Sequence, residues 1–107
     1  MQKEFDKAKE IIQEEIGKAG LKIERIILFG SRARGDYSED SDWDILVILK
    51  NEFTREVKRR TLRNIYSGLA GLENSYEIIL MSKRDFERMK DIVGSLSYAA
   101  ELEGITI

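Results

Sequence analysis

Five consecutive apolar residues, Ile45-Leu46-Val47-Ile48-Leu49, restrict most strongly what this chain can fold into. The run is far shorter than the roughly 20 apolar residues that cross a bilayer as a helix. It is rich in β-branched residues and therefore predicts a strand inside a sheet, which with the preceding residues spans Asp42–Leu49. The segment Ile23–Phe29 becomes apolar in the same way and predicts a second buried strand.

Three further segments carry apolar residues at helical spacing with charges between them, which predicts three amphipathic helices. The members are Phe5, Ala8, Ile12, Ile16 and Ala19 in the first, Phe53, Val57, Leu62, Ile65, Leu69 and Leu72 in the second, and Phe86, Met89, Val93, Leu96 and Ala100 in the third. The first helix is expected to end near Gly20 and the second near Gly71. Ser82 and Asp85 form a capping pattern at the start of the third, which Gly94-Ser95 can break into two pieces.

Two remaining apolar segments complete the order of elements. Tyr76–Met81 predicts a third strand, and Ile105–Ile107 predicts a short edge strand. Helices and strands then alternate in a pattern that indicates an α+β fold, with helices packed on a small mixed β-sheet. Because 107 residues is the length of one domain, we expect residues 1–107 to form a single domain.

The absence of cysteine and histidine narrows the chemistry that this chain can perform. Without these residues there is no thiolate nucleophile, no histidine general base and no metal bound by cysteine or histidine. Acid–base and metal chemistry must therefore rely on carboxylates. Carboxylate oxygens select hard cations such as Mg²⁺, Mn²⁺ or Ca²⁺.

Charge is abundant but nearly balanced, with 18 Lys and Arg against 20 Asp and Glu and a net charge of −2. Neither nucleic acid nor a membrane is therefore an expected partner. The polar start at Met1–Glu4 leads into no signal-peptide core, so we expect a cytoplasmic protein. A local exception is the basic run of Arg55, Lys58, Arg59, Arg60 and Arg63, which fits either a solvated helix face or a polyanion-binding face.

The stretch between the first two predicted strands carries the strongest chemical signal. Gly30-Ser31 follows a buried strand directly, where a glycine lets backbone N–H groups approach a ligand closely. Asp42 and Asp44 stand two residues apart on the next predicted strand, so both carboxylates face one side and Trp43 faces the other. Glu77 lies in the third strand, and if that strand neighbours the second, three carboxylates can hold one or two Mg²⁺ ions.

Two common motifs fail on this stretch. Gly30 to Gly35 has the glycine spacing of a P-loop, but Asp36-Tyr37 stands where that motif requires Lys followed by Ser or Thr. The spacing of Asp40, Asp42 and Asp44 imitates the start of a calcium-binding EF-hand loop. That loop requires Gly and Glu at positions that hold Ile45 and Asn51 here.

Gly30-Ser31, ten intervening residues, Asp42-x-Asp44 and a later strand acid together resemble the DNA polymerase β-like nucleotidyltransferases. The similarity is greatest to the minimal nucleotidyltransferase domains, and it implies their palm-like fold and a nucleoside triphosphate substrate. It implies that Gly30 and Ser31 hold the β- and γ-phosphates, with Arg32 near them. It also implies that Asp42, Asp44 and Glu77 are catalytic and ligate Mg²⁺, with Glu77 assisting deprotonation of the acceptor, although this position is more often Asp in the family.

The resemblance implies transfer of AMP from ATP to an acceptor hydroxyl with release of pyrophosphate. The chain leaves no residues for an acceptor-binding domain, so we expect the acceptor to lie on another polypeptide or a second copy. Minimal members of the family often pair with a small helical HEPN protein in toxin–antitoxin-like modules, and modification of such a toxin is one expectation. A binding module that masks its partner without catalysis, and transfer to a small molecule, are the alternatives.

Overall fold

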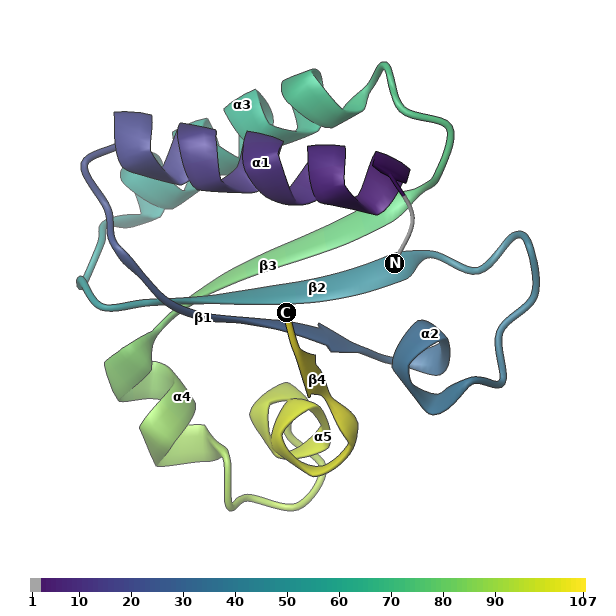
Figure 1. The fold of residues 1–107 in the computed structure, drawn as a ribbon. Helices are drawn as coiled ribbons and strands as arrows, with labels where there is room; N and C mark the ends of the chain where they lie inside the picture. The colour runs from purple at the N-terminus through teal and green to yellow at the C-terminus, as the bar shows by residue number, and fades with distance from the viewer. Residues whose placement is uncertain (1–2) are drawn as a thin grey trace.

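The computed structural model describes residues 3–107 as a four-stranded sheet with helices on both faces (Figure 1). The elements are α1 (Lys3–Lys18), β1 (Ile23–Phe29), α2 (Ser31–Arg34), β2 (Trp43–Leu49), α3 (Arg55–Leu69), β3 (Tyr76–Ser82), α4 (Lys83–Met89), α5 (Leu96–Glu103) and β4 (Ile105–Thr106). Met1 and Gln2, which the predicted domain 1–107 and the predicted polar start include, lie outside the described residues. Across residues 3–107, every helix is too short or too polar to cross a bilayer.

The sheet has the strand order β3-β2-β1-β4 and mixes both strand directions. β1 runs antiparallel to β2 and to β4, whereas β2 and β3 run parallel. A parallel pair needs a crossover connection, and α3 supplies it between β2 and β3. The predicted small mixed sheet is therefore present, and it places β3 directly beside β2.

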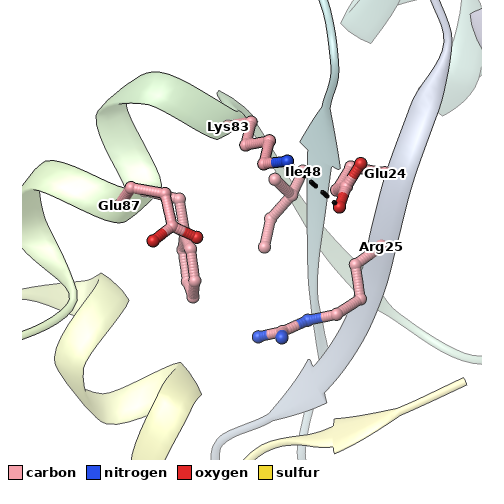
Figure 2. Close-up of a pocket in the computed structure, with 6 residues that line it drawn as sticks. Glu24, Arg25, Ile48, Lys83 and Glu87 are labelled. Carbon is pink, nitrogen blue, oxygen red and sulfur yellow. Dashed lines mark ion pairs between the residues drawn. The ribbon is translucent and has the colours of Figure 1, made fainter.

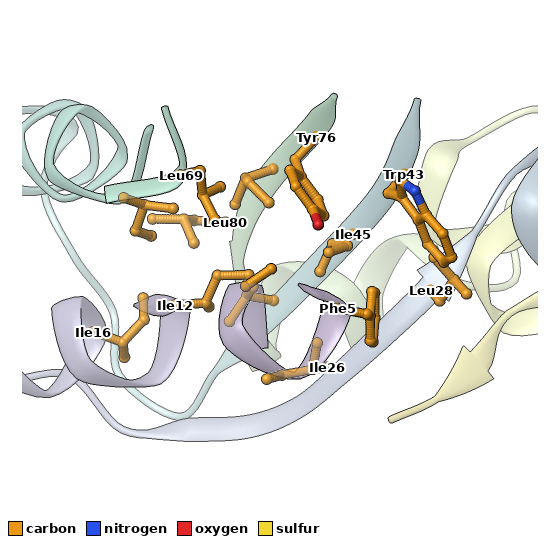
Figure 3. Close-up of a cluster of buried hydrophobic side chains, with 14 of the residues drawn as sticks. Phe5, Ile12, Ile16, Ile26, Leu28, Trp43, Ile45, Leu69, Tyr76 and Leu80 are labelled. Carbon is orange, nitrogen blue, oxygen red and sulfur yellow. The ribbon is translucent and has the colours of Figure 1, made fainter. Parts of the chain in front are cut away.

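Each face of the sheet buries its own apolar layer. α1 and α3 cover one face, where Trp43, Ile45, Val47 and Leu49 of β2 point (Figure 3). α4 and α5 cover the other face, where Leu46 and Ile48 pack with Phe86 and Ala100. This alternation explains the unbroken apolar run of β2, because a strand covered on both faces has no polar side.

The predicted helices are present but differ at their ends, since Phe53 and Leu72 of the second predicted helix lie outside α3. The third predicted helix forms two helices, α4 and α5, as the Gly94-Ser95 pair allowed: α4 ends at Met89, and Gly94, with a positive φ of 92°, lies in the turns that precede α5. The Ser95 hydroxyl then accepts a hydrogen bond from Tyr98 N at 3.0 Å and caps α5. At the other end of α4, Ser82 caps the helix through Asp85 N, as its sequence pattern predicted.

The second strand starts one residue later than the sequence pattern predicts. β2 begins at Trp43, so Asp42 precedes the strand instead of opening it. The backbone N–H of Trp43 donates to Ser75 O at 2.9 Å and joins this entry to the start of β3. Asp42 is consequently exposed at the end of the loop, one residue ahead of the buried Trp43.

Candidate active site

Three residues from adjacent strands lie side by side across the sheet. In the strand register, Phe29 of β1 pairs with Asp44 of β2, and Asp44 pairs with Glu77 of β3. Neighbouring strands are about 4.8 Å apart, and in-register residues point to the same face. Asp44 and Glu77 therefore share the α4–α5 face, while the neighbouring Trp43 and Tyr76 enter the opposite core (Figure 3).

Gly30 approaches Asp44 more closely than any other residue type could. Its φ of 76° and ψ of −160° fall in a region that only glycine adopts readily. A Cβ built on Gly30 would also collide with Asp44 Oδ2. The turn after β1 thus brings bare backbone against this carboxylate, as the predicted role of Gly30-Ser31 requires.

Ser31 opens α2, a single helical turn at the end of β1. The carbonyl oxygen of Gly30 accepts hydrogen bonds from Ala33 N at 3.1 Å and Arg34 N at 3.0 Å, which fixes the turn. The Ser31 side chain is half-buried. Within residues 3–107 its hydroxyl takes part in none of the side-chain hydrogen bonds, so it is available to a ligand.

Asp42, Asp44 and Glu77, which we call the acidic triad, influence one another electrostatically. Burial raises the pKa of Asp44, and the negative charges of Asp42 and Glu77 raise it further, while Arg34 opposes this rise. Asp44 is half-buried, whereas Asp42 and Glu77 are exposed. None of the three forms an ion pair within the described residues.

The acidic triad is not gathered into a finished metal site. Within residues 3–107, no group of three or more carboxylates is close enough together to hold a metal ion as it stands. The strand register brings the backbones of Asp44 and Glu77 together, but the carboxylates of the triad do not converge on one point. Convergence on one ion would require them to turn toward each other.

Arg32 points toward the loop between α2 and β2. Its guanidinium lies between two aromatic rings, 4.4 Å from the centre of Tyr37 and 4.7 Å from the centre of Trp43. It also donates to Ser41 O at 3.1 Å and Glu39 O at 3.3 Å. These contacts fix Arg32 against the loop that ends at Asp42, so we call Arg32 the loop clamp. Its predicted contact with a nucleotide stays a prediction.

Arg34, unlike Arg32, influences the acidic triad electrostatically. It pairs with Asp36 at 3.3 Å and with Glu103 at 2.9 Å, and its charge lowers the pKa of Asp44. Residues two apart on a helical turn point to nearly opposite sides, so Arg32 and Arg34 cannot both face the same strand end. Helical spacing in the Gly-Ser-Arg-Ala-Arg-Gly segment is the sequence signal that separates the two roles.

The strand that carries Glu77 is anchored from two directions. The Glu4 carboxylate on α1 accepts hydrogen bonds from Glu73 N, Asn74 N and the Tyr76 hydroxyl, which lower the pKa of Glu4 against the opposing effect of burial. The Tyr66 hydroxyl on α3 accepts from Ile78 N at 2.8 Å. Neither contact was predictable from local sequence, because each joins residues 12 or more positions apart.

A second charged cluster lies on the same face, in a pocket between β1 and α4 (Figure 2). Glu24, Arg25, Ile48, Lys83, Phe86 and Glu87 line it, and its volume is about 40 Å³. Lys83 pairs with Glu24 at 3.6 Å, and Arg25 pairs with Glu101 at 3.1 Å while stacking over Phe86 at 5.2 Å. The pocket has room for water but not for a nucleotide.

A family model described as a nucleotidyltransferase domain matches residues 5–102. The chain belongs to this nucleotidyltransferase family. Two relatives from Methanocaldococcus jannaschii, named "Putative protein adenylyltransferase" MJ0141 and MJ0604, are 48% identical over 42 residues and 67% identical over 27 residues. These segments cover 39% and 25% of this chain but only 42% and 27% of the relatives, so the chain matches less than half of either one.

Three solved structures share the fold of this nucleotidyltransferase domain at low sequence identity. A "putative nucleotidyltransferase" from Sulfolobus solfataricus has a TM-score of 0.59 and 22% identity, with coverage of 96% of this chain and 80% of that one. A toxin–antitoxin complex with AMP-PNP has a TM-score of 0.54 and 20% identity over 98% of this chain and 72% of that one. A mutant of the toxin–antitoxin MntA-HpeT gives 0.52 and 18%, over 94% and 69%.

These comparisons confirm the predicted family and the predicted α+β nucleotidyltransferase fold. The roles assigned to Gly30, Ser31, Arg32 and the acidic triad, and the predicted Mg²⁺, are not tested by them. The structure brings Gly30, Asp44 and Glu77 together and leaves Asp42 at the adjoining loop end. It places Arg32 apart from them, against the loop.

Proposed function

We propose that this domain transfers AMP from ATP to a hydroxyl group on a partner protein, with Mg²⁺ as cofactor. The observation that carries the proposal is the alignment of Gly30, Asp44 and Glu77 at one end of the sheet. Family membership supports nucleotidyl transfer as the reaction. The names of the two archaeal relatives support a protein as acceptor, and the AMP-PNP of one structural neighbour supports an adenine nucleotide as donor.

The residues present fit a Mg²⁺ ion by their chemistry. Asp42, Asp44 and Glu77 supply the carboxylate oxygens that this ion prefers. Burial and the charges of Asp42 and Glu77 raise the pKa of Asp44, and a divalent cation would offset the cost of keeping this carboxylate ionised. When bound, Mg²⁺ would neutralise phosphate charge and polarise the phosphoryl oxygens.

The remaining chemistry falls to the chain's own groups. Gly30, without a side chain, lets the turn pack directly against Asp44, and the Ser31 hydroxyl that follows it donates to the phosphate oxygens. Glu77 accepts the proton of the acceptor hydroxyl. The acceptor oxygen then forms its bond to the α-phosphorus while the bond to the pyrophosphate oxygen breaks, so AMP is transferred and pyrophosphate leaves.

A second function, masking of a partner without catalysis, is favoured by one observation. The acidic triad does not converge in the structure, and Glu77 is exposed. Two structural neighbours are toxin–antitoxin complexes, which supports a toxin protein as the partner in either case, and the family resemblance favours a small helical HEPN-type protein in that role. A masking protein would inhibit its partner without ATP or Mg²⁺, which separates the two functions.

The test follows label from ATP into protein. The chain is incubated with candidate partner proteins, Mg²⁺ and ATP labelled at either the α- or the γ-phosphate, and intact masses are recorded. We expect α-label transfer and a mass gain of one AMP, with no γ-label transfer. The double variant D42N/D44N should abolish transfer, whereas D40N/D91N, which removes two exposed aspartates elsewhere, should not. Equal labelling by D42N/D44N would falsify the catalytic assignment.

A further inference from the structure

The outer face of α3 carries a concentration of positive charge that the proposed reaction does not use. The helix holds five cations and a single carboxylate, Glu56, so it carries a net charge of +4 while the rest of the chain carries −6. The cations are Arg55, Lys58, Arg59, Arg60 and Arg63, which we call the basic stripe. All five are exposed, because Thr61, Ile65 and Leu69 turn the opposite side of the helix into the core.

The cations of the basic stripe also lack carboxylate partners. Within residues 3–107, none of its five cations forms an ion pair. Elsewhere on the surface, Lys18, Lys83, Arg88 and Lys90 each have a carboxylate partner at 3.0 to 3.6 Å. Isolated cations such as Lys9 and Lys50 also lack an ion pair in the described part of the chain, so what distinguishes the stripe is that five unpaired cations lie within nine consecutive residues.

The arrangement works against the stability of the isolated helix. Arg55, Arg59 and Arg63 follow one another at intervals of four residues, where like charges repel. Arg55 also opens the helix, and the positive end of the helix dipole disfavours a cation there. An anionic partner would remove both penalties at once.

The basic stripe also borders a surface groove. Arg59, Arg60 and Arg63, together with Glu56, line a groove of about 280 Å³ on the outside of the helix. α3 lies on the α1 side of the sheet, and the stripe occupies its first half, which follows the far end of β2. Asp44 and Glu77 lie near the starts of β2 and β3, the opposite end of the sheet from the start of α3.

The partner chemistry follows from the extent of the charge. From Arg55 to Arg63 the stripe spans about 12 Å, at 1.5 Å per helical residue. Outside α3 the chain carries a net charge of −6, which disfavours a polyanion much longer than the stripe, such as RNA. A short set of carboxylates on a protein surface matches the stripe, and arginine binds carboxylates with two parallel hydrogen bonds.

We propose that the basic stripe of α3 is a docking surface for an acidic helix of a partner protein. This proposal goes beyond the proposed function and does not depend on it, because none of its residues belongs to the acidic triad or the Gly30-Ser31 turn. The complementary helix carries Glu or Asp at intervals of four residues, which places its carboxylates along Arg55, Arg59 and Arg63.

The test measures binding of two labelled probes by fluorescence anisotropy. One probe is a helical peptide of about 15 residues with glutamate at every fourth position. The other is a single-stranded RNA of equal net charge. Wild type is compared with R59E/R63E and with R84E/R88E, a control that makes the same charge change at the same spacing on exposed positions of α4.

We expect the peptide to bind wild type and R84E/R88E alike, and R59E/R63E at least about tenfold more weakly. The difference should shrink between about 50 and about 200 mM NaCl. In addition, R59Q/R63Q should unfold at a higher temperature than wild type, because it removes like-charge repulsion without a partner present. Absence of peptide binding, equal weakening by both charge-reversed variants, or tighter binding of the RNA would overturn the proposal.

Discussion

Two charged clusters share the α4–α5 face of the sheet and differ in how their charge is balanced. In the pocket between β1 and α4, Lys83 pairs with Glu24 (Figure 2), and Arg25 pairs with Glu101. The three carboxylates of the acidic triad form no ion pair within the described residues, and burial together with the charges of Asp42 and Glu77 raises the pKa of Asp44. The charges of the first cluster are balanced by ion pairs within the protein. The carboxylates of the second are not, and a bound cation would lower the free energy of their ionised form.

The sharpest way to separate the clusters is Asp44→Asn. AMP transfer should fall by at least about 100-fold, since even the outer partners of metal ligands contribute up to that much. At pH 7 without metal, the midpoint of thermal unfolding should rise by a few degrees. Burial and the charges of Asp42 and Glu77 raise the pKa of Asp44, so the folded state disfavours the ionised form, and Asn removes that penalty.

Calorimetry with and without Mg²⁺ checks this prediction. Wild type should gain stability when the ion is added, while the Asn variant should not. The wild-type gain should also diminish as the pH falls through the raised pKa of Asp44, because protonation removes a ligand. A metal-free Asn variant that melts below wild type would contradict the assignment of strain to this carboxylate.

Gly30→Ala should have the next largest effect, on stability as well as activity. The new Cβ collides with Asp44 Oδ2. The alanine backbone must also keep a conformation that costs residues other than glycine about 1–3 kcal/mol. Gly35→Ala is the matched control, because Gly35 has a φ of 91° but nothing within 4 Å of its added Cβ. In urea unfolding, G30A should lose clearly more free energy than G35A, and equal losses would argue against close contact at Gly30.

Arg32→Gln distinguishes the nucleotide contact predicted from sequence from the loop clamp seen in the structure. A loosened clamp leaves Asp42 less well placed, so the Mg²⁺ concentration for half-maximal transfer should rise by about tenfold. ATP affinity measured without Mg²⁺ should stay unchanged. Loss of that affinity would instead show that Arg32 binds phosphate.

Lys83→Gln should have the smallest effect. It breaks the pair with Glu24, and both partners are partly exposed, so the free energy of unfolding should fall by about 1 kcal/mol or less. AMP transfer should be unchanged, because the pocket is neutral without a ligand. A marked loss of transfer with normal stability would show that this pocket, too, takes part in the reaction.

Much of the fold follows from local sequence patterns. The apolar run Ile45–Leu49 predicted an interior strand, and alternation correctly set Trp43 into the core with Asp44 on the other face. The predicted third strand contains Glu77, as β3 does in the structure, and there Glu77 is exposed between the buried Tyr76 and Ile78. These properties depend on residues within a few positions of one another, and sequence records them directly.

The parts that sequence did not predict depend on contacts between distant segments. Local patterns do not determine that Asp44 and Glu77 are in register, because register is set by the crossover through α3. The choice between Arg32 and Arg34 depends on which side of a one-turn helix meets Trp43. The family resemblance predicted the composition of the site, whereas the packing assigned a position to each arginine.

The hydrogen bonds between the Glu4 carboxylate and the segment before β3 suggest how the protein loses activity on heating or acidification. Its carboxylate retains its three hydrogen bonds only while the first turn of α1 stays wound. Warming can fray that turn, and protonation of Glu4 weakens the same bonds as the pH falls through its lowered pKa. Either change frees the segment Glu73–Tyr76, which precedes Glu77, while the central strands stay paired. Catalytic failure should therefore precede the cooperative loss of the sheet.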